Sequence, residues 1–436
     1  MANESIFLII NLISLCATHF FCLPLRQSTI ELILFMSTLT LAIIVVFVLG
    51  YALIAMESLT KINKAAVALL MFVFCWVLYM VDPSPFVQLM HPEFKGIGDQ
   101  LVTFANKLIT EHLGDTATTL FFLMGAMTIV EIVDQNGGFN WVKDVMRSKS
   151  KRSLLWKIAF MTFFLSAILD NLTTSIVMIM ILRKLVQDHK DRMIYASLVI
   201  IAANSGGAFS PIGDVTTIML WNAGMITAGG VISEIFIPSL ISMIIPAFVL
   251  QFLLKGKLGG DMLETDHSGD TELLEFNGSQ RKIIFAIGVG GLCFVPVFHY
   301  FTDLPPFVGI LLVLGILWTI TEIFYRSLHR SKGDSEDFSK RVSNLLSRID
   351  MSTILFFLGI LMAVACLEEV GILHELGGGL NSFFQGNHYA VTGVIGVLSS
   401  IVDNVPLVAG SMGMYPVQAT GDMAVDGIFW QLLAYC

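Results

Sequence analysis

The chain has 436 residues, of which 55% are hydrophobic and only 14% are charged, whereas soluble proteins carry about 25% charged residues. Many windows of about 20 residues hold few or no charges, which is the signature of membrane-spanning helices. The composition predicts an all-α polytopic membrane protein and excludes an ordinary soluble enzyme. The net charge of -9 is carried largely by loops, and no basic stretch stands apart from the membrane flanks, so nucleic acid is not an expected partner.

The first apolar run predicts a membrane helix at the N-terminus. Residues 5–22 are apolar, and MANESIFLIINLISLC has no basic region of the kind that precedes a cleaved signal. Residues 1–29 are therefore expected to remain as an N-terminal transmembrane helix. Further runs of about 20 apolar residues predict more spans. These runs are 30–52, 65–82, 118–136, 194–221, 229–254, 281–300, 306–325 and 352–371.

Two other apolar stretches, 153–184 and 389–417, do not have the length of a simple span. Each holds roughly 30 residues, which is too many for one span and too few for two spans and a turn. Each also has a polar middle, Asp170-Asn171-Leu172-Thr173-Thr174 in the first and Asp403-Asn404 in the second. We therefore predict two re-entrant hairpins whose polar tips lie near the middle of the membrane.

Basic residues indicate which side of the membrane a loop faces, because cytoplasmic loops carry an excess of Lys and Arg. Segments 141–157 and 183–192 flank the first hairpin and are rich in both, so this hairpin is predicted to enter from the cytoplasm. Loops 372–388 and 416–428 contain neither, so the second hairpin is predicted to enter from outside. The same reasoning predicts a cytoplasmic N-terminus, in a bacterial-type inner membrane.

The stretch Asn204–Trp221, read as NSGGAFSPIGDVTTIMLW, breaks a long apolar run with glycine and proline. These residues loosen backbone hydrogen bonding, which a bilayer tolerates only where the segment is buried in protein or lines a cavity. A carboxylate at that depth, Asp214, marks a functional site. No Gly-Lys-Ser/Thr follows the glycines, so neither a phosphate loop nor ATP-driven transport by this chain is predicted.

The chain also contains an internal repeat. Asp115-Thr-Ala-Thr-Thr-Leu-Phe-Phe-Leu123 aligns with Asp350-Met-Ser-Thr-Ile-Leu-Phe-Phe-Leu358, and the two Asp-Asn tips align at a similar offset. Two halves with hairpins from opposite sides predict an inverted-repeat transporter with unwound transmembrane helices. The expected units are a first repeat at 30–256, a cytoplasmic loop at 257–280 and a second repeat at 281–436.

The repeat has a consequence at the C-terminus. The counterpart of Asn204–Trp221 falls beyond Cys436. The second repeat is therefore expected to be truncated, either because the protein lacks its last helices or because the sequence is a truncated product.

Three motifs resemble the NhaD-type sodium/proton antiporters of the ion transporter superfamily. They are DNLTTSIVMIM (170–180), NSGGAFSPIGDVTTIMLW (204–221) and SSIVDNVPLVAG (399–410), and GYALIAMESLTKINKAAVALLM (50–71) is similar too. The resemblance covers essentially the whole chain and implies exchange of cytoplasmic Na⁺ or Li⁺ for external protons, mostly at alkaline pH. The functional positions that it implies are Asp170, Asn171, Asn204, Asp214, Thr216, Thr217, Ser399, Asp403 and Asn404.

The chemistry of these residues agrees with that function. Na⁺ takes several oxygen ligands, and tips of Asp, Asn and Thr, including Thr173, supply them beside unwound-backbone carbonyls. Burial disfavours the ionised form of a carboxylate, whereas Na⁺ favours it, so a proton and a cation compete for one group. The expected substrates are small inorganic cations and protons in contact with the lipid bilayer, with no resident cofactor or transition metal. Many transporters of this architecture are homodimers, which makes a homodimer a further expectation.

Structural roles remain open for the same residues. Asp170 and Asp403 could cap the inner helices of their hairpins, and Asp214, Thr216 and Thr217 could satisfy backbone groups freed at the break. Four carboxylates near span ends are interpreted as solvated or snorkelling rather than as ligands, and these are Glu131, Asp134, Glu368 and Glu369. The histidines show no clustered spacing.

Two other functions also remain open. An anion or dicarboxylate carrier of the same superfamily is the alternative within transport, although a carboxylate at each tip would repel an anion. The third possibility is a non-transporting membrane protein.

Overall fold

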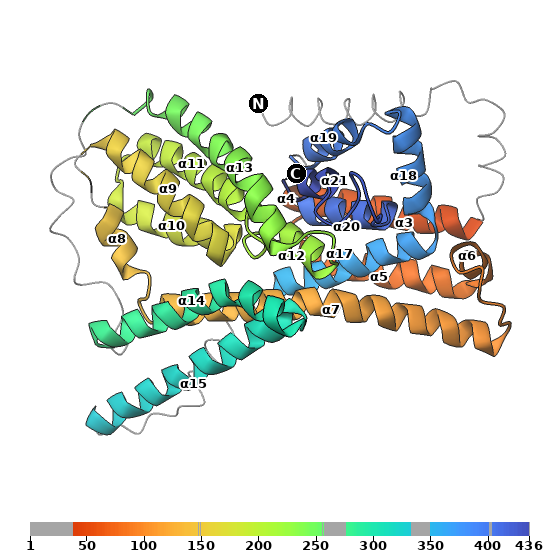
Figure 1. Ribbon diagram of the computed structural model, residues 1–436, viewed down its shortest axis with the longest axis horizontal. Helices are drawn as coiled ribbons and strands as arrows, with labels where there is room; N and C mark the ends of the chain where they lie inside the picture. Colours follow the sequence, from red (N-terminus) through yellow and green to blue (C-terminus); the bar gives the residue numbers. More distant parts are fainter. Residues whose placement is uncertain are drawn as a thin grey trace.

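The computed structural model describes residues 38–146, 148, 150–254, 256, 276–332, 349–400 and 403–435. Within them the chain is almost entirely helical, apart from an isolated β-bridge between Gln418 and Ala424. The predicted first span at 5–22 lies outside the described residues. The helices, labelled in Figure 1, are α3 (Thr38–Ala55), α4 (Glu57–Thr60), α5 (Lys64–Val81), α6 (Ser84–Met90), α7 (Asp99–Gln135), α8 (Asn140–Met146), α9 (Lys151–Leu169), α10 (Asn171–Leu185), α11 (His189–Ala208), α12 (Val215–Asn222), α13 (Ala228–Leu250), α14 (Gly278–Thr302), α15 (Pro306–Lys332), α17 (Met351–Glu369), α18 (Ile372–Phe383), α19 (His388–Ser399), α20 (Asn404–Met414) and α21 (Ile428–Tyr435).

Eight of the described helices are long and apolar enough to cross a membrane, namely α3, α5, α7, α9, α13, α14, α15 and α17. Their outer surfaces are rich in exposed aliphatic side chains, such as Leu49 at 60% exposure and Val81 at 66%. So much exposed apolar surface is unusual on a soluble protein and suits contact with lipid. The prediction of an all-α polytopic membrane protein is confirmed.

Two groups of helices lie side by side (Figure 1). One contains α9, α10, α11 and α13, which pack on one another, and the other contains α3, α5, α17, α18 and α20. The short helix α12 lies between the groups and contacts α7, α20 and α21. Helix α7 runs along both groups, and α14 and α15 pack on it on the side of the group that contains α9. Helix α12 thus lies where the two groups meet.

Both predicted hairpins consist of two helices joined at the polar tip. Helices α9 and α10 meet at Asp170, and α19 and α20 meet just before Asn404. At 1.5 Å per residue the 19 residues of α9 extend about 28 Å, close to the thickness of a hydrocarbon core of about 30 Å. Helices α10, α19 and α20 have 15, 12 and 11 residues and are shorter than a full span. A turn back within the membrane therefore remains a prediction for both pairs.

Three elements differ from the sequence-based prediction. The span predicted at 118–136 is the second half of α7, whose 37 residues extend about 55 Å. The predicted loop 372–388 contains α18, an amphipathic helix in which Leu373 and Gly377 are buried. No element was predicted after the loop 416–428, where the structure has α21, which buries Phe429 and Trp430. Hydropathy alone misses α18 and α21 because both are short.

Candidate cation site

Asp170 occupies the junction between α9 and α10 and caps the second helix. Its carboxylate accepts hydrogen bonds from the backbone N–H of Thr173 at 2.8 Å and from the Thr173 hydroxyl at 2.7 Å. Its backbone has φ 78° and ψ 156°, a region essentially restricted to glycine that costs of order 1–3 kcal/mol for other residues. The surrounding structure must therefore hold Asp170 in this conformation, as is common at functional sites.

The break between α11 and α12 is built from close backbone contacts at its glycines. A Cβ at Gly206 would lie 2.1 Å from the carbonyl oxygen of Phe163 on α9. A Cβ at Gly207 would lie 2.5 Å from the carbonyl oxygen of Gly213, and one at Gly213 would lie 2.7 Å from that of Gly207. The hydroxyl of Ser166 donates to the carbonyl of Ala203 at 2.6 Å. The C-terminal end of α9 thus packs directly on the break. Only glycine fits these positions.

Asn171 joins the α9–α10 junction to the broken helix. Its side-chain Nδ2 donates to Oδ2 of Asp214 at 2.7 Å and to Oδ1 of Asn204 at 3.0 Å. Asp214 is buried, with 8% of its surface exposed. A hydrogen bond to an ionised acceptor is roughly twice as strong as one between neutral groups, so the bond to Asp214 dominates. The structure thus brings Asp170, Asn171, Asn204 and Asp214 together, although 44 positions separate the first from the last.

The threonines after the break have structural roles that the sequence left open. The Thr217 hydroxyl donates to the carbonyls of Ser210 at 2.9 Å and Asp214 at 2.8 Å. The Thr216 backbone N–H donates to Asp214 Oδ1 at 3.3 Å, so Asp214 caps α12. Both threonines are buried. Thr217 therefore provides a hydrogen-bond donor to backbone carbonyls at the break.

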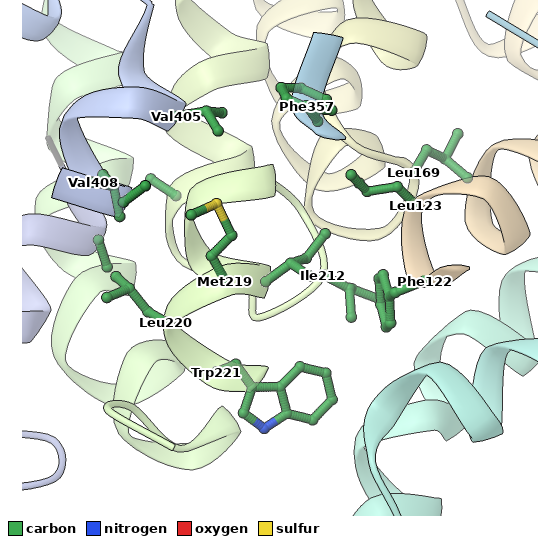
Figure 2. Packing of buried hydrophobic residues seen from close by; sticks show 14 of the residues in the cluster. Phe122, Leu123, Leu169, Ile212, Met219, Leu220, Trp221, Phe357, Val405 and Val408 are labelled. Atoms are coloured by element: carbon green, nitrogen blue, oxygen red, sulfur yellow. The ribbon is translucent and has the colours of Figure 1, made fainter. Parts of the chain in front are cut away.

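The second pair of helices places Asp403 in the equivalent position. Its carboxylate caps α20 by accepting from the Val405 N–H at 3.2 Å. Helix α20 packs on α12, and Figure 2 shows Val405 and Val408 beside Met219 and Leu220. Asp214 caps α12 and Asp403 caps α20, the two helices that pack on each other. Asn171, which follows Asp170, donates to Asp214. The three aspartates thus form one acidic region at the ends of these helices.

Two other predicted residues make fewer contacts with the rest of the site. Ser399 is the last residue of α19 and Asn404 the first of α20, and both are partly buried. Among the described residues, no side-chain hydrogen bond joins either one to Asp170, Asn171 or Asp214.

The sequence-based prediction missed Lys64, the first residue of α5. Its Nζ lies 3.5 Å from Oδ2 of Asp403. Lys64 lies in the 50–71 stretch. Its charge at the start of an apolar run was the feature of the sequence that could have indicated a role in the site. The pairing itself joins residues 339 positions apart and has no local signature.

The interpretation of Glu369 as a solvated carboxylate is wrong. Glu369 is buried at the end of α17, where Oε2 lies 3.0 Å from Nε2 of His91 and Oε1 lies 2.8 Å from Nε2 of His112. Both imidazole rings lie against aromatic side chains, His91 on Phe104 and His112 on Trp76. The two histidines are far apart in the sequence, so their spacing gave no sign of this cluster.

The arrangement around α12 combines anionic and neutral oxygen groups with helix ends. The N-termini of α10 and α12 carry Asp170 and Asp214, while the C-terminal ends of α9 and α11 bring negative dipole ends to the same place. Discontinuous helices with carboxylates at the break are typical of secondary transporters, where half-helix ends coordinate ions. The fold and the site together define a polytopic helical membrane transporter.

Comparison with known proteins agrees with this class. Residues 51–435 match the model of the citrate transporter family (CitMHS). The chain belongs to this family. It is 39% identical over 392 residues to sodium/proton antiporter 2 of Arabidopsis thaliana, covering 89% of this chain and 86% of the relative.

Other relatives carry similar names. Identity to sodium/proton antiporter 1 of Arabidopsis thaliana is 40% over 395 residues, covering 91% of this chain but 63% of the longer relative. Identity to the Na(+)/H(+) antiporter NhaD of Alkalimonas amylolytica is 28% over 403 residues, covering 87% of this chain and 77% of the relative. The resemblance to NhaD-type antiporters is therefore confirmed.

Proposed function

We propose that this protein is a secondary Na⁺(Li⁺)/H⁺ antiporter, in which buried carboxylates bind a proton and a cation alternately. The observation that carries the proposal is the contact of Asn171 with Asp214 at 2.7 Å, beside Asp170. It brings two acidic residues and a side-chain amide to the ends of four helices. Relatives named sodium/proton antiporter support the same activity.

The balance of charge favours a cation over an anion as the substrate. Three carboxylates, those of Asp170, Asp214 and Asp403, face one ammonium group, that of Lys64, among the described residues. An anion would have to approach all three. The family description, citrate transporter, favours the alternative, a Na⁺-coupled anion or dicarboxylate carrier. Such a carrier would bind its cation at these same residues and its anion beside them.

The roles of the predicted residues follow from their contacts. We propose that Asp170 and Asp214 bind the cation or the proton, with Asn171 and Asn204 as amide ligands. Thr173, Thr216 and Thr217 hold the two carboxylates and the broken backbone in place. Asp403, Asn404 and Ser399 contribute from the second pair of helices.

The proposal includes an orientation. Basic residues around the first pair of helices favour a cytoplasmic entrance there and for the N-terminus. The absence of Lys and Arg from 372–388 and 416–428 favours an external entrance for the second pair. The two repeats would then be inverted, as in many secondary transporters that work by alternating access. We retain a bacterial-type inner membrane and a homodimer as parts of this proposal.

Everted membrane vesicles from cells without their own antiporters test the function. A proton gradient is established, and its dissipation is recorded on addition of Na⁺, Li⁺, K⁺, citrate or a dicarboxylate at several pH values. Antiport predicts a response to Na⁺ and Li⁺ in the absence of any organic anion. A response that requires the carboxylate substrate would instead identify the anion carrier. No response, from protein shown to be folded and inserted, would favour the non-transporting alternative.

A further inference from the structure

Asp403 differs from the other two aspartates because it already has a positively charged partner. Nζ of Lys64 lies 3.5 Å from Asp403 Oδ2, and the two side chains are 34% and 27% exposed. The same ammonium lies 4.2 Å from the centre of the Phe356 ring on α17. A carboxylate and an aromatic face therefore hold it from two directions, and both attract a cation.

The start of α5 is fixed so that Lys64 reaches this position. Asn63 caps α5 by accepting from the Ala65 N–H at 2.8 Å, and its side-chain Nδ2 donates to Ser352 of α17 at 2.8 Å. The Lys64 N–H donates to Glu57 Oε1 at 3.3 Å. A lysine at the first residue of a helix is disfavoured by the helix dipole. The carboxylate of Asp403 compensates for this cost.

Among the described residues, the hydrogen-bond partners of the other two aspartates of the site are neutral. Asp170 accepts from Thr173, and Asp214 accepts from Asn171 and from the Thr216 N–H. An ammonium carries the same single charge as Na⁺ and binds the same kind of oxygen. While Lys64 is paired with Asp403, that carboxylate is neutralised, so an incoming monovalent cation must compete with Lys64 for it.

Tyr51 is a second polar side chain on an element that packs on α5, because it lies on α3. Its hydroxyl is buried and, within the described residues, accepts and donates no hydrogen bond. A buried hydroxyl without a partner is costly.

We propose that Lys64 is a built-in competitor for the transported cation, whose ammonium occupies Asp403 until a cation displaces it. This inference rests on the proposed antiport and deepens it. Lys64 acts through Asp403 and is therefore a positioning residue, which sets the apparent affinity for Na⁺ and leaves the maximal rate to other groups.

The test measures Na⁺ binding and transport separately. Purified protein is heated at increasing Na⁺ concentrations at alkaline pH, and the concentration that gives half of the Na⁺-dependent rise in melting temperature is recorded. Lys64→Met keeps an apolar stem against Phe356 but removes the charge, so this concentration should fall about fivefold, as expected for a partly exposed ion pair. Lys64→Arg should keep the wild-type value. Lys61→Gln, a change at an exposed lysine three residues away, should also keep it.

Transport assays on the same variants complete the design. In proteoliposomes Lys64→Met should lower the KM for Na⁺ by a similar factor with little change in the maximal rate. An unchanged half-saturating Na⁺ concentration, or a lower rate at constant KM, would overturn the inference. If Lys64→Met does not fold, Lys64→Gln takes its place in both assays. Wild-type protein that binds Na⁺ but moves no protons would contradict the proposed antiport, while the melting assay would still decide the role of Lys64.

Discussion

Nδ2 of Asn171 lies 2.7 Å from Oδ2 of Asp214 and donates a hydrogen bond to it. This single contact connects the junction of α9 and α10 with the break between α11 and α12. Each of those junctions is local and was foreseen from glycine, proline and polar residues in an apolar run. The contact between the two junctions is a tertiary contact. It joins two separate helix breaks into one site.

Replacement of Asn171 by alanine should weaken Na⁺ binding. A donor to a carboxylate stabilises its ionised form, and a hydrogen bond to a charged group contributes about 1.5–3 kcal/mol. Without it Asp214 binds a proton more readily, so the KM for Na⁺ should rise roughly tenfold or more. The onset of transport should move to higher pH. Vesicle assays across a range of pH measure both quantities.

Asn204→Ala is the matched comparison for that variant. It removes two neutral hydrogen bonds, the 3.0 Å contact with Asn171 and the bond from Asn204 Nδ2 to the Ile200 carbonyl, and leaves the bond to Asp214 in place. Its effect on KM should be smaller, within about threefold. Equal effects of the two variants would contradict the assignment of the stronger role to the charged bond.

Asp170→Asn should abolish Na⁺-dependent proton movement while the protein remains folded. Asparagine caps a helix as well as aspartate does, but it offers no titratable group. Asp170→Ala should in addition lower the melting temperature, because it loses a cap that contributes about 1 kcal/mol. Transport and thermal unfolding of each variant separate the two roles.

The control for Asp170 is Asp188, which caps α11 by accepting from the Asp191 N–H at 2.9 Å. Asp188 lies before the helix, outside the spanning segments, and that hydrogen bond lowers its pKa below the usual value. It is therefore ionised throughout the working range of pH. Asp188→Asn should leave transport intact. A loss of transport as large as that of Asp170→Asn would show that helix capping alone explains the effects of both substitutions.

Gly206→Ala should destabilise the protein. A Cβ at this position would lie 2.1 Å from the carbonyl oxygen of Phe163, which is backbone and cannot rotate away. Overpacking of this kind costs typically 1–3 kcal/mol. Gly410→Ala is the control, since it is also buried in a helix next to the site but nothing lies within 4 Å of its Cβ. Thermal unfolding in detergent should show a clear fall for the first variant and none for the second.

The sequence predicted the helical membrane class, the boundaries of several spans and the two helix pairs with an aspartate at each junction. These features depend on local hydropathy and on residues that break helices, which a single sequence displays. It did not predict α18, because Gly377, Gly378 and Gly379 in a polar segment resemble a loop and its apolar face is short. The contact of Lys64 with Asp403 was also missed, because residues so distant in sequence meet only through the packing of α5, α17 and α20.

Glu369 provides the last prediction, because its two imidazole partners join three parts of the chain. His91 follows α6, His112 lies within α7 and Glu369 ends α17, and 278 and 257 positions separate the pairs. Glu369→Ala leaves both rings without their buried acceptor, at a cost of about 1–3 kcal/mol. The neighbouring Glu368→Ala, which makes no hydrogen bond to either histidine in the described structure, should cost less. Thermal unfolding of His91→Gln, His112→Gln and the double variant should show that the two losses are not additive, because both rings share one carboxylate. Independent, additive effects would mean that the cluster does not act as a unit.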